Sequence, residues 1–120
     1  MENVAYLEIQ DFNSDGSLKP YVGQGKPVLL MGQGNFCGHC QKAKPALQQL
    51  ANSQNQFVVA TILSDGDKSE KEASKFFKVW DNQHRGIPAY FGFSSNGKFN
   101  TTHQTGRDLE SLKKFASSLR

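Results

Sequence analysis

Compact apolar runs recur along this chain and alternate with segments in which apolar residues return every three or four positions. The run at residues 28–31 contains no polar residue, which favours a strand buried on both of its faces. Four other runs predict further strands. The predicted strands cover residues 4–9, 27–31, 57–63, 88–93 and 98–103.

Three segments show the period of an amphipathic helix instead. The first starts at Cys37, and Pro45 inside it is expected to kink the helix because proline removes a backbone hydrogen bond. Residues 13–26 contain several glycines and a proline, so only a short or broken helix is predicted there. The other two helices are predicted over residues 70–80 and 107–119.

The order of these elements predicts an α/β fold. Strands that alternate with helices form parallel pairs joined by crossovers. Asn96 and Gly97 both tolerate positive φ and predict a hairpin turn, which adds an antiparallel strand at the end of the sheet. With 120 residues and no repeat or linker, the chain is predicted to form one domain over residues 1–120, with a mixed sheet and helices on both faces.

Composition and charge exclude several classes of protein. Apolar residues make up 37% of the chain, yet no apolar run approaches the length of a bilayer span, so no membrane partner is predicted. The net charge of +3 arises from intermixed acidic and basic residues rather than from the basic stripe of a nucleic-acid binder. The first twenty residues lack the apolar segment of a signal peptide, which predicts a cytoplasmic location. A solvated helix face is expected to carry Lys68, Lys71, Lys75 and Lys78.

The two cysteines of the chain, Cys37 and Cys40, stand at the start of the first long predicted helix. Residues three apart on a helix lie one above the other, close enough for a disulfide. A thiol in the first turn faces unpaired backbone N–H groups and the positive end of the helix dipole, which lower its pKa and favour the thiolate. Cys40 should be more buried and keep a higher pKa. Cys37 is therefore the predicted nucleophile, and Cys40 is the predicted resolving thiol.

Three other roles for Cys37 and Cys40 are less consistent with the sequence. A structural disulfide is disfavoured because closing so small a loop contributes only about 2 kcal/mol on the chain-entropy model. A zinc site is disfavoured because four ligands are needed, and His39, His84 and His103 have no suitable spacing; no metal is predicted. Covalent haem attachment is excluded because Gln41, rather than histidine, follows the second cysteine.

The segment Cys37-Gly38-His39-Cys40 resembles the active-site tetrapeptide of protein disulfide isomerase catalytic domains, and residues 4–119 resemble the thioredoxin superfamily. The proline inside the first long helix, the Arg-Gly-Ile-Pro sequence at residues 85–88, the Asn-Gly hairpin and the glycine before the last helix occur in the family's order. The resemblance implies a thioredoxin fold: a central mixed sheet of parallel strands plus an antiparallel C-terminal hairpin, flanked by helices on both faces.

The resemblance also implies a thiol–disulfide oxidoreductase that acts on protein disulfides or dithiols. It implies no cofactor beyond the Cys37–Cys40 redox pair, which a separate reductase or oxidant recycles, and the protein is predicted to be a monomer. Ile87–Pro88 is expected to form a cis peptide bond beside the cysteines and, with Phe36, to bind substrate. The implied redox-tuning residues are Gly38 and His39.

His39 stands where thioredoxins that act as reductants commonly carry proline. A cation or donor at this position stabilises the Cys37 thiolate and makes the disulfide more oxidising. Replacing His39 by proline should therefore make the disulfide harder to reduce. The direction of electron flow stays open, since the tetrapeptide favours oxidation or isomerisation whereas a cytoplasmic location favours reduction.

The chain departs from the family at several positions. Phe36 replaces the usual tryptophan, and Met31 and Thr61 occupy the positions of a buried acid and its lysine partner, so another group or water must deprotonate Cys40. Gly32 and Gly34 replace larger residues, which indicates a looser loop or a close backbone approach.

Residues 80–84 form an insertion relative to the family. Two hypotheses remain for it: the loop borders the active site and shapes substrate docking, or Trp80 simply completes the apolar face of its helix. Two alternative functions also remain open. One is a thioredoxin-like protein-binding module with little redox turnover, and the other is a dimer that holds an iron–sulfur cluster through Cys37.

Overall fold

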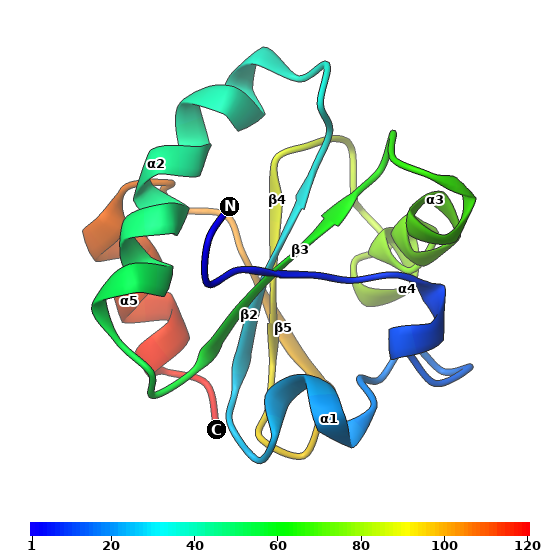
Figure 1. Ribbon diagram of the computed structural model, residues 1–120, viewed down its shortest axis with the longest axis horizontal. Coiled ribbons are helices and arrows are strands. Elements are labelled where there is room, and N and C mark those ends of the chain that lie inside the picture. The colour runs from blue at the N-terminus through cyan, green and yellow to red at the C-terminus, as the bar shows by residue number, and fades with distance from the viewer.

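The computed structural model describes residues 1–120 and places a five-stranded sheet between two layers of helices (Figure 1). The strands are β1 (Ala5–Tyr6), β2 (Val28–Gln33), β3 (Val58–Leu63), β4 (Ala89–Phe93) and β5 (Phe99–His103). The helices are α1 (Pro20–Gly23), α2 (Gly38–Ser53), α3 (Lys68–Ser74), α4 (Phe77–Trp80), α5 (Leu109–Ser117) and a short 3-10 helix, η1 (Ile9–Asp11). None of the helices combines the length and the apolarity that crossing a bilayer requires.

The sheet is mixed, as predicted. Its strand order is β1-β3-β2-β4-β5, with β3 parallel to both β1 and β2, and with β4 antiparallel to both β2 and β5. The carboxyl ends of β2 and β3 and the amino end of β4 therefore meet at one end of the sheet, which is the upper end in Figure 1. Loops from three separate parts of the chain converge there.

Two apolar layers hold the helices against the sheet. On one face α2 and α5 cover side chains that include Leu29 and Met31 of β2, and on the other face α3 and α4 cover side chains that include Leu30. Every residue of β2 is buried, because this strand lies at the centre of the sheet with helices on both sides. The apolar run without alternation at residues 28–31 reflects this position.

Several predicted elements have different bounds in the structure, and three of these differences have a clear cause. The predicted strand at 4–9 shortens to β1, because reciprocal hydrogen bonds between Glu8 and Asp11 cap η1. The predicted helix at 70–80 is divided into α3 and α4, and the turn between them lets Phe76 and Phe77 both pack against the core. The last helix begins at Leu109 because the carboxylate of Asp108 accepts the N–H of Ser111.

Candidate active site

The cysteine pair lies where the chain passes from β2 into α2. Cys37 is the N-cap of α2, and the backbone N–H of Cys40 donates to Cys37 Sγ at 3.1 Å. The two cysteines form a disulfide, with their Cα atoms 5.2 Å apart. The sulfur of Cys37 thus occupies the position of a capping acceptor at the helix start, where backbone N–H groups favour negative charge.

The two cysteines differ in exposure to solvent. Cys40 is 0% exposed and belongs to the core layer beneath α2, whereas Cys37 is only partly buried. Gly38 and His39, between them, are exposed. The side chain of Phe36, directly before Cys37, is 97% exposed and is therefore free to contact another molecule. A partner could reach Cys37 but not Cys40.

The loop before β4 brings a third part of the chain to the cysteines. The Ile87–Pro88 peptide bond is cis, as the resemblance implied, and the carbonyl oxygen of Ile87 lies 3.7 Å from Cys37 Sγ. Residues 50 positions apart in the sequence are thus in contact. Phe36, Cys37, Ile87 and Pro88 therefore lie at the same end of the sheet, while their roles in substrate binding stay predictions.

Two glycines allow close backbone contacts at this end of the sheet. A Cβ atom on Gly32 would lie 2.6 Å from the ring of Phe77, and one on Gly34 would lie 2.9 Å from Ile87 Cδ1. A side chain at either position would displace these neighbours. Of the two explanations that the sequence left open for these glycines, the close approach is the one that the structure supports.

The comparisons with known proteins agree with this geometry. The family model named Thioredoxin matches residues 8–118. The chain belongs to the thioredoxin family. Membership of this family supports the thiol–disulfide oxidoreductase class and a redox-active disulfide in place of a cofactor.

Individual relatives of this thioredoxin-family chain come from several groups. Thioredoxin-like protein 453L of Invertebrate iridescent virus 6 is 29% identical over 122 residues, which cover 91% of this chain and 88% of the viral protein. Protein disulfide-isomerase erp38 of Neurospora crassa is 28% identical over 95 residues, which cover 76% of this chain but only 24% of the isomerase. The solved structure of thioredoxin f from spinach chloroplast (short form) matches with a TM-score of 0.69 at 19% identity, covering 96% of this chain and 91% of that chain. These matches show the thioredoxin fold.

Asp65 is a site residue of this thioredoxin-family chain that the sequence analysis missed. Its carboxylate oxygens accept the backbone N–H groups of Asn35 (2.8 Å) and Phe36 (3.1 Å), the two residues directly before Cys37. These hydrogen bonds lower the pKa of the Asp65 carboxyl below its ordinary value of 3.8. An acidic residue two positions after a buried strand was the available signal, because the carboxyl ends of neighbouring parallel strands lie side by side.

A buried polar chain lies next to Met31, the residue that replaces the family's acid. Gln33 Nε2 donates to Thr61 Oγ1 at 2.7 Å, and Thr61 Oγ1 donates to the backbone oxygen of Met31 at 2.7 Å. Gln33, Thr61 and Met31 are all 0% exposed. The single hydroxyl proton of Thr61 is donated to Met31, so Thr61 Oγ1 can only accept from Gln33. The Gln33 amide therefore directs its nitrogen toward Thr61, and Gln33 Oε1 has no hydrogen-bond partner. No carboxylate belongs to this buried polar chain.

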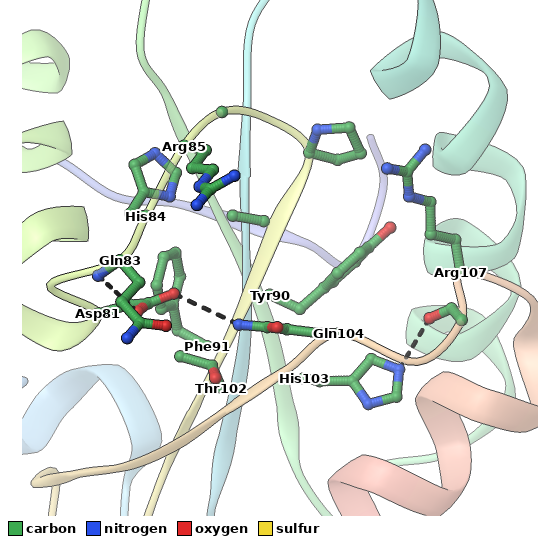
Figure 2. Close-up of a pocket in the computed structure, with 14 residues that line it drawn as sticks. Asp81, Gln83, His84, Arg85, Tyr90, Phe91, Thr102, His103, Gln104 and Arg107 are labelled. Carbon is green, nitrogen blue, oxygen red and sulfur yellow. Dashed lines mark hydrogen bonds between the residues drawn. The ribbon is translucent and has the colours of Figure 1, made fainter.

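The structure bears on both hypotheses made for the insertion at residues 80–84, although an effect of this loop on substrate docking stays a prediction. Trp80 is buried among aromatic side chains of the core, and its Nε1 donates to the backbone oxygen of Gly16 at 3.1 Å. Asp81, Gln83 and His84 line a cavity that also includes Pro88 (Figure 2). Trp80 therefore completes the core, and the residues after it border the active-site end of the sheet.

The three histidines of the chain lie in different surroundings. Burial lowers the pKa of His84 below 6.5, which keeps its imidazole neutral at pH 7. The ring of His103 contacts the backbone oxygen of Gly106 at 2.7 Å through Nε2, and His39 is exposed in the first turn of α2. No cluster of three or more His, Cys, Asp or Glu side chains is placed to hold a metal ion.

Proposed function

We propose that this chain is a thiol–disulfide oxidoreductase that acts on protein substrates through Cys37 and Cys40. The observation that carries the proposal is the position of Cys37 Sγ, which is partly exposed, receives the N–H of Cys40 and lies against Ile87 of the cis-proline loop. The isomerase relatives support the same chemistry.

In the reducing direction, the Cys37 thiolate attacks one sulfur of a substrate disulfide. A Cys37–substrate disulfide forms, and the other substrate sulfur leaves as a thiolate that takes up a proton. Cys40 then loses its proton and attacks Cys37 Sγ, which restores the Cys37–Cys40 disulfide and releases the first substrate sulfur as a thiolate. Two electrons pass to the substrate, and a separate dithiol protein must reduce the pair again.

The surrounding residues set the rates of these two steps. The N–H of Cys40 and the start of α2 stabilise the attacking thiolate, and exposed His39 adds a donor beside it. The second step is expected to be slow, because buried Met31 provides no base near Cys40. Phe36 and the backbone of Ile87 are the proposed contacts for an extended substrate segment.

The test is reduction of insulin with dithiothreitol as the electron donor. We expect the wild-type protein to be active and Cys37→Ser to be inactive. In a separate reaction, the reduced Cys40→Ser variant is freed of dithiothreitol before insulin is added. It should then accumulate a covalent mixed disulfide with the substrate, because the resolving thiol is missing; gel electrophoresis under non-reducing conditions would detect it. The same activity in Cys37→Ser as in wild type would contradict the proposal.

A second candidate function is a protein-binding module with little redox turnover. The replacement of the buried acid by Met31 and the 97% exposure of Phe36 favour it, since the first removes a proton relay and the second offers an apolar contact. If wild type and Cys37→Ser are equally inert towards disulfides and bind the same proteins equally well, the binding module is the better description.

A further inference from the structure

A polar cavity lies beside the cis-proline loop, at the end of the sheet that carries the cysteines. Its volume is about 670 Å³, and it lies between residues 81–86 on one side and residues 104–107 on the other, with Pro88 in its wall (Figure 2). The preceding residue, Ile87, contacts Cys37 Sγ through its carbonyl oxygen. A polypeptide bonded to Cys37 would therefore lie close to the mouth of this cavity.

Two arginines line the cavity from opposite sides. Figure 2 shows Arg85 on the loop before β4 and Arg107 on the loop before α5, with no hydrogen bond at either guanidinium group. One acidic residue, Asp81, lines the same cavity, and its carboxylate is already engaged by the backbone N–H of Gln83 (3.0 Å) and by Gln104 Nε2 (3.5 Å). The cavity thus holds two arginine charges against the single negative charge of Asp81, and neither arginine forms an ion pair.

A buried hydroxyl in the same wall also lacks a partner. Tyr90 is 4% exposed and its hydroxyl makes no hydrogen bond. Figure 2 shows this hydroxyl directed toward the side of Arg107. Burial raises the pKa of Tyr90 to about 12, against the opposing influence of Arg107, so the group remains a hydrogen-bond donor at neutral pH. An unpaired buried donor is costly, and an acceptor seated in the cavity would relieve that cost.

We infer that this cavity receives a carboxylate side chain of the disulfide-bearing protein that reacts with Cys37. The inference rests on the proposed function and adds a substrate class to it: segments with Asp or Glu within a few residues of the reacting cysteine. A guanidinium group binds a carboxylate through two parallel hydrogen bonds, and two unpaired arginines provide the complementary charge. Asp81 reduces the positive charge of the cavity, but the two arginines outnumber it, so carboxylate side chains are still preferred over cationic ones.

The test uses two disulfide peptides that are identical except for glutamate or glutamine at the positions flanking the cysteine. We expect the reduced wild-type protein to react about fivefold faster with the glutamate peptide at low salt, and this preference should shrink as salt is added. The double variant Arg85→Gln, Arg107→Gln should lose the preference. Lys98→Gln removes one positive charge at the hairpin, outside the cavity, and should keep it.

A binding measurement separates this inference from the proposed function. Cysteine-free versions of both peptides are titrated into the oxidised protein, and the double arginine variant serves as the comparison. If no peptide is reduced but the glutamate peptide still binds more tightly through the arginines, the redox proposal fails and the carboxylate-binding cavity stands. If both peptides react and bind equally well with the wild-type protein, the pocket does not select carboxylates and the inference is wrong.

Discussion

Asp65 fixes the two residues that lead into the reactive cysteine. It lies in the loop after β3, yet its carboxylate accepts the backbone N–H groups of Asn35 and Phe36, which are 30 and 29 positions away in the sequence. Those N–H groups precede α2 and have no helical acceptor of their own. The carboxylate therefore orders the loop before Cys37.

Asp65→Asn should destabilise this loop in a pH-dependent way. The folded-state pKa of Asp65 is lowered, so its stabilisation is present at pH values above its ordinary value of 3.8 and is lost as the pH falls through the lowered folded value. Thermal unfolding of wild type and variant between pH 7 and pH 2 would measure this. The difference between the unfolding temperatures of wild type and variant should be constant near neutral pH and should disappear in acid. A temperature difference that is independent of pH would show that the charge of Asp65 is not involved.

At the scale of elements, a polar link joins β2 and β3 beneath α2. Parallel strands in the centre of a sheet are normally held by backbone bonds and apolar packing, but here Thr61 of β3 also bonds the backbone of Met31 and the side chain of Gln33 in β2. All three groups are out of contact with water. A hydrogen bond lost at this depth cannot be replaced by solvent.

Thr61→Val keeps the shape of the side chain and removes the hydroxyl. We expect the free energy of unfolding to fall by about 1–3 kcal/mol, because the Gln33 amide is left without an acceptor and the Met31 carbonyl without this donor. Urea unfolding would measure the change. Thr61→Ser is the control: it keeps the hydroxyl and should lose less stability than the valine variant. Equal losses in both variants would assign the effect to packing.

At the scale of the whole molecule, an aromatic cluster joins distant segments on the face of the sheet that α3 and α4 cover. Trp80 lies with its ring centre 5.6 Å from that of Phe12, 5.0 Å from Phe91, 5.0 Å from Phe93 and 6.3 Å from Phe99. These residues come from the N-terminal segment, β4 and β5. The Trp80 side chain thus connects Phe12, in the segment before α1, to the hairpin formed by β4 and β5.

Trp80→Ala should lower the free energy of unfolding by about 3–5 kcal/mol, because it leaves a large cavity in this cluster. Trp80→Phe should cost less, since it keeps part of the ring area. Denaturant unfolding gives the stability, and the alkylation rate of reduced Cys37 in folded protein gives the reactivity of the active site. We expect the alkylation rate to stay at the wild-type value in Trp80→Phe. A large change in that rate would show that Trp80 also shapes the site.

Local patterns in the sequence determined the order of helices and strands, the mixed sheet and the cysteine pair. Apolar periodicity indicates directly which face of each element is buried. The separation of Cys37 from Cys40 by about one helical turn depends only on their spacing in the sequence. Bounds were predicted less well where a side chain competes for backbone groups, as Asp108 does at the start of α5.

Only the tertiary structure decided which distant residues complete the site. Asp65 reaches the loop before Cys37, Thr61 reaches Gln33, and Arg85 and Arg107 line one cavity, although each pair is separated by more than a complete element of the fold. Periodicity contains no information about these partners, because a polar side chain after a strand looks the same whether it meets solvent or a neighbouring loop. Asp65 and Thr61 meet their partners because β2 and β3 run parallel, side by side. The two arginines line one cavity because antiparallel pairing places the amino end of β4 beside the carboxyl end of β5.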